Sequence, residues 1–408
     1  MLPLLVALNG GKPAQANGLK ADECVMLMPG IVKVPDGSRD LQAEFSVWVY
    51  ENERRPGMRT LFARYLDIDR DALSEAEHER YEQRTSLFLK DSERGKTVSI
   101  RVDGFDQPIL MPETNSAGRS RLVAPLPRHV WQGRGNPIPY QVSGCEPRAE
   151  YGLLWPIEAE GVSIVSDIDD TIKVSDVQDT KQLLRNTFLK PFEAAPGMAA
   201  WYRQMGGLPP VKPVNRGADQ GRQRDLAGEA GGESAEWHAE TSDTSSANVA
   251  VRDDARRAPK AGGTDIQFHY LSSSPLQLLP LLTAFLSEAN FPPGTLMLRE
   301  STSWRSLLPG DGDSEAHKHA QLRRLITTFP KRQFVLIGDS GEADPEIYAE
   351  VARQYPRQVR AIFIRDVTGE KADAPRYQRT FGSLPRQKWF IIADGAEGKA
   401  AFDRAGIL

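Results

Sequence analysis

Val162-Ser-Ile-Val-Ser-Asp-Ile-Asp-Asp-Thr-Ile-Lys173 is the stretch from which the fold of this chain can be inferred. Its apolar run, residues 162–165, is typical of a short buried strand. An acidic cluster follows at once, made of Asp167, Asp169 and Asp170. Carboxylates at the end of a buried strand repel one another, and a cation that prefers oxygen ligands, such as Mg²⁺, neutralises them. The stretch therefore predicts a metal-assisted aspartate site; the alternative is a strand followed by an acidic turn.

Strand-like runs alternate with helical patterns in the part of the chain beyond residue 160. This rhythm is typical of βαβ units around a parallel sheet, so we expect an α/β fold there. The expected helices are residues 196–205, 276–289, 317–329 and 345–354. The expected strands are residues 162–165, 266–271, 295–298, 334–337 and 359–364, with an edge strand at 389–392. Ligands of such sheets bind outside the carboxyl ends of the strands, where the aspartates would lie.

The preceding part of the chain has the pattern of antiparallel strands. Apolar residues at 41, 43, 45, 47 and 49 alternate with other residues, which is the period of a strand with one buried face. A charged stretch, residues 71–89, is compatible with a helical insertion. We therefore expect a smaller β-sandwich-like domain over residues 20–150, with a supporting or binding role.

The expected organisation is a start segment 1–19, the β-rich domain 20–150, the α/β domain 151–395 and a tail 396–408. Residues 207–263 are rich in glycine and charge, with Trp237 as a solitary aromatic residue, so we expect a disordered insert there. The start resembles a secretory signal, with an A-x-A pattern at residues 14–16, but it has no charged leading region. Both a clipped signal of an exported protein and an ordinary start of a cytoplasmic one remain open, and the second is favoured.

Composition narrows the function classes. The 408 residues carry a formal net charge of −4, and 26% of them are charged. This balance gives no sign of a nucleic-acid partner, and no apolar run reaches the length of a transmembrane helix. Cys24 and Cys145 are the only cysteines, which excludes a disulfide framework and leaves their pairing open.

Polar residues follow several of the expected strands. Three serines, residues 272–274, end the second strand, and Asp339 and Asp344 follow the fourth. Lys318 lies near the start of the preceding helix, where its ammonium could meet a phosphoryl group and a carboxylate. A carboxylate nucleophile, an acid/base, a metal ion, phosphate-binding hydroxyls and a cation form the inventory of phosphoryl transfer.

Two arginines also fall at strand ends, Arg299 after the third strand and Arg365 after the fifth. The guanidinium fork suits a phosphate group. A substrate-binding role and an ordinary surface ion pair remain open for both.

The order of these motifs resembles that of the haloacid-dehalogenase-like phosphatases. More narrowly, the stretches that start at Ser166, Leu183, Tyr270, Leu336 and Ile362 resemble the phosphatidate phosphatases related to the yeast actin patch protein. The likeness covers roughly residues 150–395 apart from the insert. It implies a haloacid-dehalogenase-like (Rossmann-like) parallel sheet. The chain lacks the proline-rich tails of eukaryotic members, so an actin-patch role is not carried over.

The resemblance implies a role for each matched position. Asp167 would be the nucleophile that forms an aspartyl-phosphate, and Asp169 would serve as general acid and base. Lys318 would steady the phosphoryl group. The phosphate would be bound by Thr171 and Ser272, with Ser273 as the alternative hydroxyl. Mg²⁺ would be held by the Asp167 carboxylate, the Asp169 carbonyl, Asp339 and Asp344.

The predicted function is Mg²⁺-dependent hydrolysis of phosphatidate, or of a related lipid phosphate, with transient contact to a membrane surface. The amphipathic stretch 180–192 could touch that surface or cover the site. No metal other than Mg²⁺ and no nucleic acid are expected. Two alternatives remain: a phosphatase for soluble or nucleic-acid-end phosphates, and an inactive protein that binds lipid or phosphate.

Overall fold

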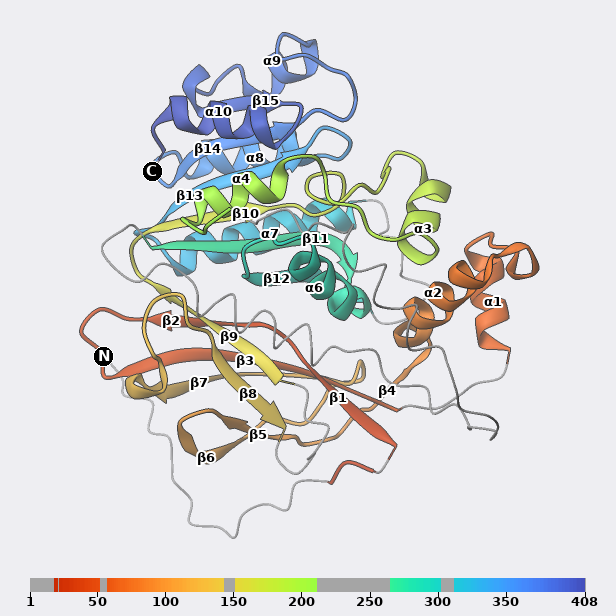
Figure 1. The fold of residues 1–408 in the computed structure, drawn as a ribbon. Coiled ribbons are helices and arrows are strands. Elements are labelled where there is room, and N and C mark those ends of the chain that lie inside the picture. The colour runs from red at the N-terminus through yellow and green to blue at the C-terminus, as the bar shows by residue number, and fades with distance from the viewer. Residues whose placement is uncertain are drawn as a thin grey trace, which may run out of the picture.

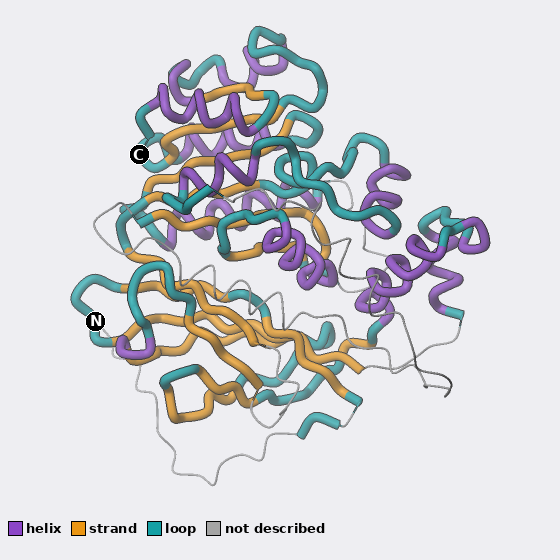
Figure 2. The backbone as a smooth tube through the Cα atoms, in the orientation of Figure 1, coloured by secondary structure: helices purple, strands orange, loops and turns teal. Residues whose placement is uncertain are grey.

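The computed structural model describes residues 18–20, 22–51, 57–142, 151–210, 265–301 and 312–407 (Figures 1 and 2). Two β-sheets dominate this part of the chain, with most helices gathered around the second sheet. Residues 211–264, most of the predicted insert, lie outside the described residues, as do Cys145 and nearly all of the predicted start segment. None of the described helices combines the length and the apolar character needed to cross a membrane.

The first sheet has nine strands, and its main path runs β1-β3-β2-β9-β8-β5-β6. Strands β4 and β7 pair with β3 as well. All pairs are antiparallel except β2 with β9, so the sheet is mixed. The strands are β1 (Glu23–Leu27), β2 (Gly30–Val34), β3 (Asp40–Glu51), β4 (Asp91–Ser92), β5 (Ser99–Val102), β6 (Phe105–Leu110), β7 (Arg119–Pro127), β8 (Ile138–Val142) and β9 (Tyr151–Glu158).

The predicted buried face of β3 is confirmed, because Leu41, Ala43, Phe45, Val47 and Val49 are all fully buried. The alternation ends at Val47, since Trp48 and Tyr50 on the opposite face are buried as well. The residues of the predicted face share one core with side chains of β5, β8 and β9 at the far end of the strand order. The sheet therefore curls over its own core, and its strands form one continuous sheet in place of the two sheets of a sandwich.

Strand β9 differs from the expected organisation. Residues 151–158 were predicted to begin the α/β domain, but they pair with β2 and β8 of the first sheet. Six consecutive residues, 152–157, are buried, and their side chains divide between the two sheets: Leu154 joins the core of the first sheet, whereas Ile157 joins a core of the second. A continuous apolar run has no alternation of apolar and polar residues, so the sequence does not show which of the two sheets this strand joins.

The second sheet is wholly parallel and confirms the predicted α/β architecture. Its order is β12-β11-β10-β13-β14-β15, with β10 at the centre. Because the chain leaves β10 first to one side and later to the other, the carboxyl end of β10 lies at a topological switch point. The strands are β10 (Val162–Ser166), β11 (Ile266–Pro275), β12 (Thr295–Arg299), β13 (Gln333–Asp339), β14 (Val359–Arg365) and β15 (Trp389–Ile392).

Helices cover both faces of this sheet (Figure 1). One face packs against α4 (Met198–Met205), α6 (Leu279–Glu288) and α10 (Gly395–Ala405). The other packs against α7 (Asp313–Thr328), α8 (Asp344–Gln354) and α9 (Pro375–Phe381). Helix α10 lies where a tail was expected; Ala401 and Phe402 are buried, and α10 packs against α4.

A helical insertion joins β3 to β4, as the charged stretch 71–89 predicted. It contains α1 (Met58–Tyr65), α2 (Glu75–Thr85) and a 3₁₀ turn at Ser86–Leu89. Ser74 begins α2 with a reciprocal capping box, in which it pairs with Glu77. The rings of Phe62, Phe88 and Phe188 pack together, so the insertion contacts α3 (Thr180–Phe188), the helix that follows the aspartate loop.

Candidate active site

The loop after β10 folds back sharply around Asp170. This residue adopts a left-handed backbone conformation with φ of 52°. Its carboxylate is buried and accepts hydrogen bonds from the main-chain N–H groups of Ser175, Asp176 and Val177 at 2.7 to 3.0 Å. Asp170 is therefore the residue that closes the loop, which sequence reasoning did not recognise. The closure holds Asp167 and Asp169 at the carboxyl edge of the sheet.

Lys318 of α7 gathers three carboxylates around one buried ammonium. Its Nζ atom lies 2.8 Å from Asp167 Oδ1, 2.8 Å from Glu342 Oε2 and 2.6 Å from Asp344 Oδ1. Burial alone would lower the pKa of Lys318, but these carboxylates outweigh burial and raise it well above its usual value. The lysine is therefore a permanent cation beside the candidate nucleophile.

The carboxylates around this lysine outnumber it. Burial raises the pKa of Asp167 well above its usual value, and the neighbouring carboxylates Asp344, Glu342 and Asp339 raise it further against the opposing effect of Lys318. Burial, followed by the charge of Asp344, raises the pKa of Asp339 in the same way. An additional cation would relieve this repulsion.

The oxygen atoms that could bind such a cation can be identified. Asp167 Oδ2 is buried and has no hydrogen-bond partner among the described residues. Asp339 Oδ1 accepts the N–H groups of Gly341 and Glu342, whereas Oδ2 has, within the described part of the chain, only a 3.5 Å contact with Thr171 Oγ1. Side-chain oxygens of Asp167, Glu342 and Asp344 also lie within 4.8 Å of one another. This set consists of hard oxygen ligands, the kind that Mg²⁺ prefers.

Asp169 belongs to a second cluster. Its Oδ1 atom lies 2.8 Å from Lys173 Nζ and accepts the Ser175 hydroxyl at 2.8 Å. Its Oδ2 atom accepts the hydroxyls of Ser272 at 3.1 Å and Ser274 at 2.9 Å. Burial opposes the ionisation of Asp169, but Lys173 and the hydroxyl donors outweigh it and lower the pKa of this carboxyl to about 2.

The remaining predicted residues lie nearby with separate partners. The Ser273 hydroxyl pairs with Ser314, away from Asp169. Arg299 Nε donates to the Ser273 carbonyl at 3.1 Å, and Arg365 Nη1 donates to the Asp170 carbonyl at 2.6 Å. Both arginines thus support the main chain of the site, and their role toward a substrate stays a prediction.

Sequence reasoning missed Lys173 and Glu342, and it gave no particular role to Ser274, the last of the three serines. Lys173 follows Asp169 by four residues at the end of the acidic stretch, and Glu342 lies between Asp339 and Asp344. Ser274 could have been found from strand periodicity. Alternate residues of a strand share a face, and the hydroxyls of Ser272 and Ser274 do both reach Asp169, although the pairing of β11 with β12 is irregular here.

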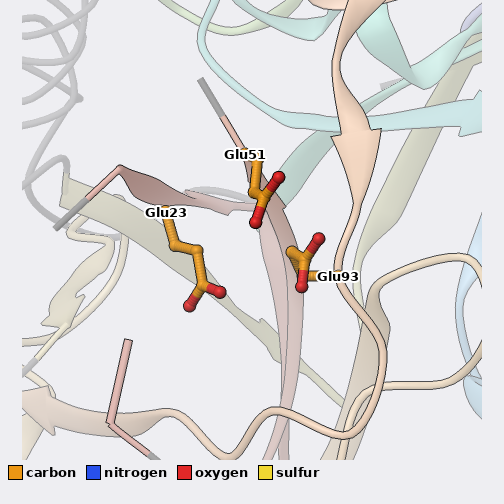
Figure 3. Close-up of side chains that lie close together, drawn as sticks. All are labelled: Glu23, Glu51 and Glu93. Atoms are coloured by element: carbon orange, nitrogen blue, oxygen red, sulfur yellow. The ribbon is translucent and has the colours of Figure 1, made fainter. Parts of the chain in front are cut away.

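Another acidic cluster lies in the first sheet, where Glu23, Glu51 and Glu93 approach one another (Figure 3). Two of these carboxylates have cations of their own. Lys96 pairs with Glu23, and Lys20 Nζ lies 2.8 Å from Glu51. Glu23 and Glu51 therefore belong to a network of ion pairs where β1 begins and β3 ends, whereas the carboxylates around Lys318 outnumber the cation they share.

The fold and the site together define an α/β protein of the parallel-sheet class, with a carboxylate-rich site at the strand ends. A family described as "Phosphatidate phosphatase APP1, catalytic domain" matches residues 162–215 and 241–366. Every candidate site residue lies within these matched segments. The parallel-sheet region of this chain is therefore similar to that family over these segments.

Two relatives extend the comparison. Phosphatidate phosphatase APP1 of Saccharomyces cerevisiae is 28% identical over 298 residues, which cover 71% of this chain and 39% of the relative. An uncharacterized protein of Schizosaccharomyces pombe is 28% identical over 235 residues, which cover 56% of this chain and 29% of the relative. The chain thus matches well under half the length of these relatives.

Proposed function

We propose that this protein is a Mg²⁺-dependent phosphatidate phosphatase with a haloacid-dehalogenase-like domain, and that it acts through an aspartyl-phosphate on Asp167. One observation carries the proposal: the buried Asp167 pairs with Lys318 through one oxygen, while its other oxygen has no partner among the described residues. A nucleophilic carboxylate beside a fixed cation suits attack on phosphorus. The family match supports a lipid phosphomonoester as substrate.

The reaction proceeds in two displacements. The Asp167 carboxylate attacks phosphorus, and the bond from phosphorus to the ester oxygen breaks as Asp169 gives that oxygen a proton. Water then attacks the aspartyl-phosphate while Asp169 takes a proton from it. The bond between phosphorus and the Asp167 oxygen breaks, which releases inorganic phosphate and restores the carboxylate. The Lys318 ammonium stabilises the charge that develops on the phosphoryl oxygens.

Mg²⁺ would be held by Asp167, Asp339 and the Asp169 carbonyl, with Asp344 in support, and would neutralise the phosphoryl group and the crowded carboxylates. Glu342 joins this set as a carboxylate shared with Lys318. The oxygen of Asp167 without a partner and the raised pKa values of Asp167 and Asp339 support the fit.

The serines at the end of β11 explain how Asp169 could act as an acid although its pKa is about 2. In the described state, Ser272 and Ser274 both donate to its carboxylate. A bound phosphate would accept these hydroxyls instead and would add negative charge beside Asp169. Loss of two donors and gain of a nearby anion both raise the pKa of a carboxyl. Substrate binding would therefore prepare the general acid.

The test is a substrate panel with and without Mg²⁺, comparing phosphatidate in mixed micelles with lysophosphatidate, sugar phosphates and nucleotide phosphates. We expect Mg²⁺-dependent phosphate release that is fastest with the lipids. Asp167→Asn is the matched control, because it changes one atom of the nucleophile. Faster turnover of soluble phosphates would favour the alternative phosphatase, and no turnover of any substrate would favour the binding protein.

A further inference from the structure

We propose that Arg84 of the α1–α2 insertion is a positioning residue for Asp169, and that it acts through Phe192 and Lys173. The inference rests on the proposed function, in which Asp169 is the acid and base. The helical insertion, which belongs to the first sheet, would then contribute to catalysis at the edge of the second sheet.

The first link joins Lys173 to Asp169. Lys173 is buried, and its Nζ atom lies 2.8 Å from Asp169 Oδ1 and pairs with Ser175 Oγ, which also donates to that carboxylate. Lysine side chains are flexible, so an ammonium orients a carboxylate only if its own position is fixed. The position of Lys173 therefore sets the direction of the candidate acid.

The second link joins Lys173 to Phe192. The segment after α3 runs beside the aspartate loop and is held there by main-chain hydrogen bonds, from Val174 to the Glu193 carbonyl and from Ala195 to the Ile172 carbonyl. This pairing brings the Phe192 ring to 5.0 Å from Lys173 Nζ, measured to the ring centroid. A cation at this distance is attracted by the negative face of an aromatic ring.

The third link joins Phe192 to Arg84 of α2. The guanidinium carbon of Arg84 lies 4.1 Å from the same ring centroid. Its Nη1 atom donates to the carbonyls of Thr187 at 2.6 Å and Lys190 at 2.7 Å. These carbonyls belong to the end of α3 and the turn after it, where a helix leaves carbonyl groups without internal partners.

Arg84 thus fixes the segment between the aspartate loop and Phe192. Its side chain is buried, and its hydrogen bonds go to carbonyl groups of α3 and the following turn. Burial lowers the pKa of Arg84 to about 10, so it stays charged at neutral pH. Removal of the guanidinium would free the end of α3 and the Phe192 ring, and Lys173 would lose one of the contacts that fix it.

The experiment compares Arg84→Met with Arg80→Met. Arg80 lies one turn earlier on α2 and donates through Nε to the Leu189 carbonyl at 2.7 Å, so it supports the same turn without a described contact to the Phe192 ring. We expect Arg84→Met to lower kcat on phosphatidate by roughly tenfold or more with little change in KM, because small displacements of a catalytic group are costly. The loss should shrink for p-nitrophenyl phosphate, whose leaving group needs little protonation. Arg80→Met should stay within about twofold of the parent, since its contact lies outside the pathway to Asp169.

Combination with Asp169→Asn separates positioning from a general structural effect. If Arg84 acts through Asp169, Arg84→Met should cause no further loss in the Asp169→Asn background. If Arg84→Met does not fold, as judged by circular dichroism, Phe192→Leu replaces it, because leucine fills much of the same volume but lacks the ring face. Three outcomes would overturn the inference. Arg84→Met could lower kcat equally in the parent and in the Asp169→Asn background, it could have the same effect on kcat as Arg80→Met, or it could leave kcat unchanged.

Failure of this inference is distinguishable from failure of the proposed function. A parent without turnover, or an Asp169→Asn variant with unchanged kcat, would refute the proposed chemistry itself. A parent that is active and impaired by Asp169→Asn, together with an Arg84→Met variant that behaves like Arg80→Met, would refute the positioning role alone.

Discussion

The buried charged groups at the two ends of strand β10 differ in how fully they are paired. At the amino end, the fully buried Arg332 donates hydrogen bonds from all three guanidinium nitrogens. It lies 2.7 Å from Asp265 Oδ2, and its other acceptors are Ser163 Oγ and the carbonyls of Glu158, Glu160, Val162 and Asp265. At the carboxyl end, the carboxylates of Asp167, Glu342 and Asp344 surround the ammonium of Lys318, and Asp339 lies close enough to feel their charge.

This contrast separates a structural site from a functional one. A buried charge with all its partners present contributes to the fold, whereas a buried carboxylate without a donor costs stability until a ligand arrives. Asp167 Oδ2 is such an oxygen among the described residues, and no nitrogen of Arg332 is left in that condition. Substitutions at the carboxyl end should therefore mainly lower turnover, and substitutions at the amino end should mainly lower the free energy of unfolding.

The largest effect on activity is expected from Asp167→Asn. The amide is a poor nucleophile and a weak ligand, so turnover should fall to background. The free energy of unfolding without Mg²⁺ should hold steady or rise, because one of the repelling carboxylates is removed. Phosphate release and thermal denaturation measure the two quantities. Turnover well above background in this variant would refute the covalent mechanism.

Asp169→Asn should have the next largest effect. Its carbonyl can still bind Mg²⁺, but the proton for the leaving group is lost, and such help is worth roughly 10²–10⁴-fold. The loss of kcat should be smaller for p-nitrophenyl phosphate than for phosphatidate. A comparison of both substrates measures this, and equal losses would argue against the acid role.

At the opposite end of β10, Arg332→Met should reduce stability instead of catalysis. It leaves the Asp265 carboxylate buried without its partner, and loss of one partner of a buried pair costs about 3–5 kcal/mol. The turnover of the folded fraction should stay within a few-fold of the parent. The neighbouring Lys331→Met is the control, because its ion pair with Asp36 is exposed and should matter far less. Chemical denaturation gives both free energies.

His269 near the amino end should make stability depend on pH. It is buried between Ser163 and Thr295, and burial followed by the charge of Arg332 lowers its pKa from 6.5 to about 3. Between pH 6.5 and about pH 3, His269 is protonated in the unfolded chain but not in the folded one. The free energy of unfolding should therefore fall as the pH drops through this range, by at most about 1.4 kcal/mol per pH unit. His269→Gln should flatten that slope in denaturation curves. An unchanged slope would mean that other groups control it.

The smallest effect is expected from replacement of residues 211–264 with a short Gly/Ser linker. Helix α4 ends at Met205, and β11 begins at Ile266, which pairs with Val162, the first residue of β10. Both attachment points thus lie at the amino edge, and the candidate site lies at the carboxyl edge. Turnover on a soluble substrate should stay within about a few-fold, since distant sites act independently. A large loss with the fold intact would show that the insert contributes to the site.

The sequence by itself determined the strands of the parallel sheet and the residues at their ends. Apolar runs and acidic clusters are local patterns, and parallel strands necessarily bring their carboxyl ends to one edge. This is why Asp167 and Asp344 could be grouped before any contact between them was known. It is also why Asp339 could be expected in the same group. Lys318 was added because it lies near the start of a helix and because the resemblance implies a role for it.

Only the tertiary structure decided which of these groups touch and which sheet a buried strand joins. Tyr151–Glu158 pairs with β2 and β8 of the first sheet although its buried side chains reach the cores of both sheets, and no period in the sequence reveals this choice. Lys173 meets Asp169 because the left-handed turn at Asp170 reverses the chain, and Arg84 reaches Phe192 from a segment about a hundred residues away. Side-chain direction after a strand depends on the backbone of the turn and on what packs against it, and both are properties of the whole fold.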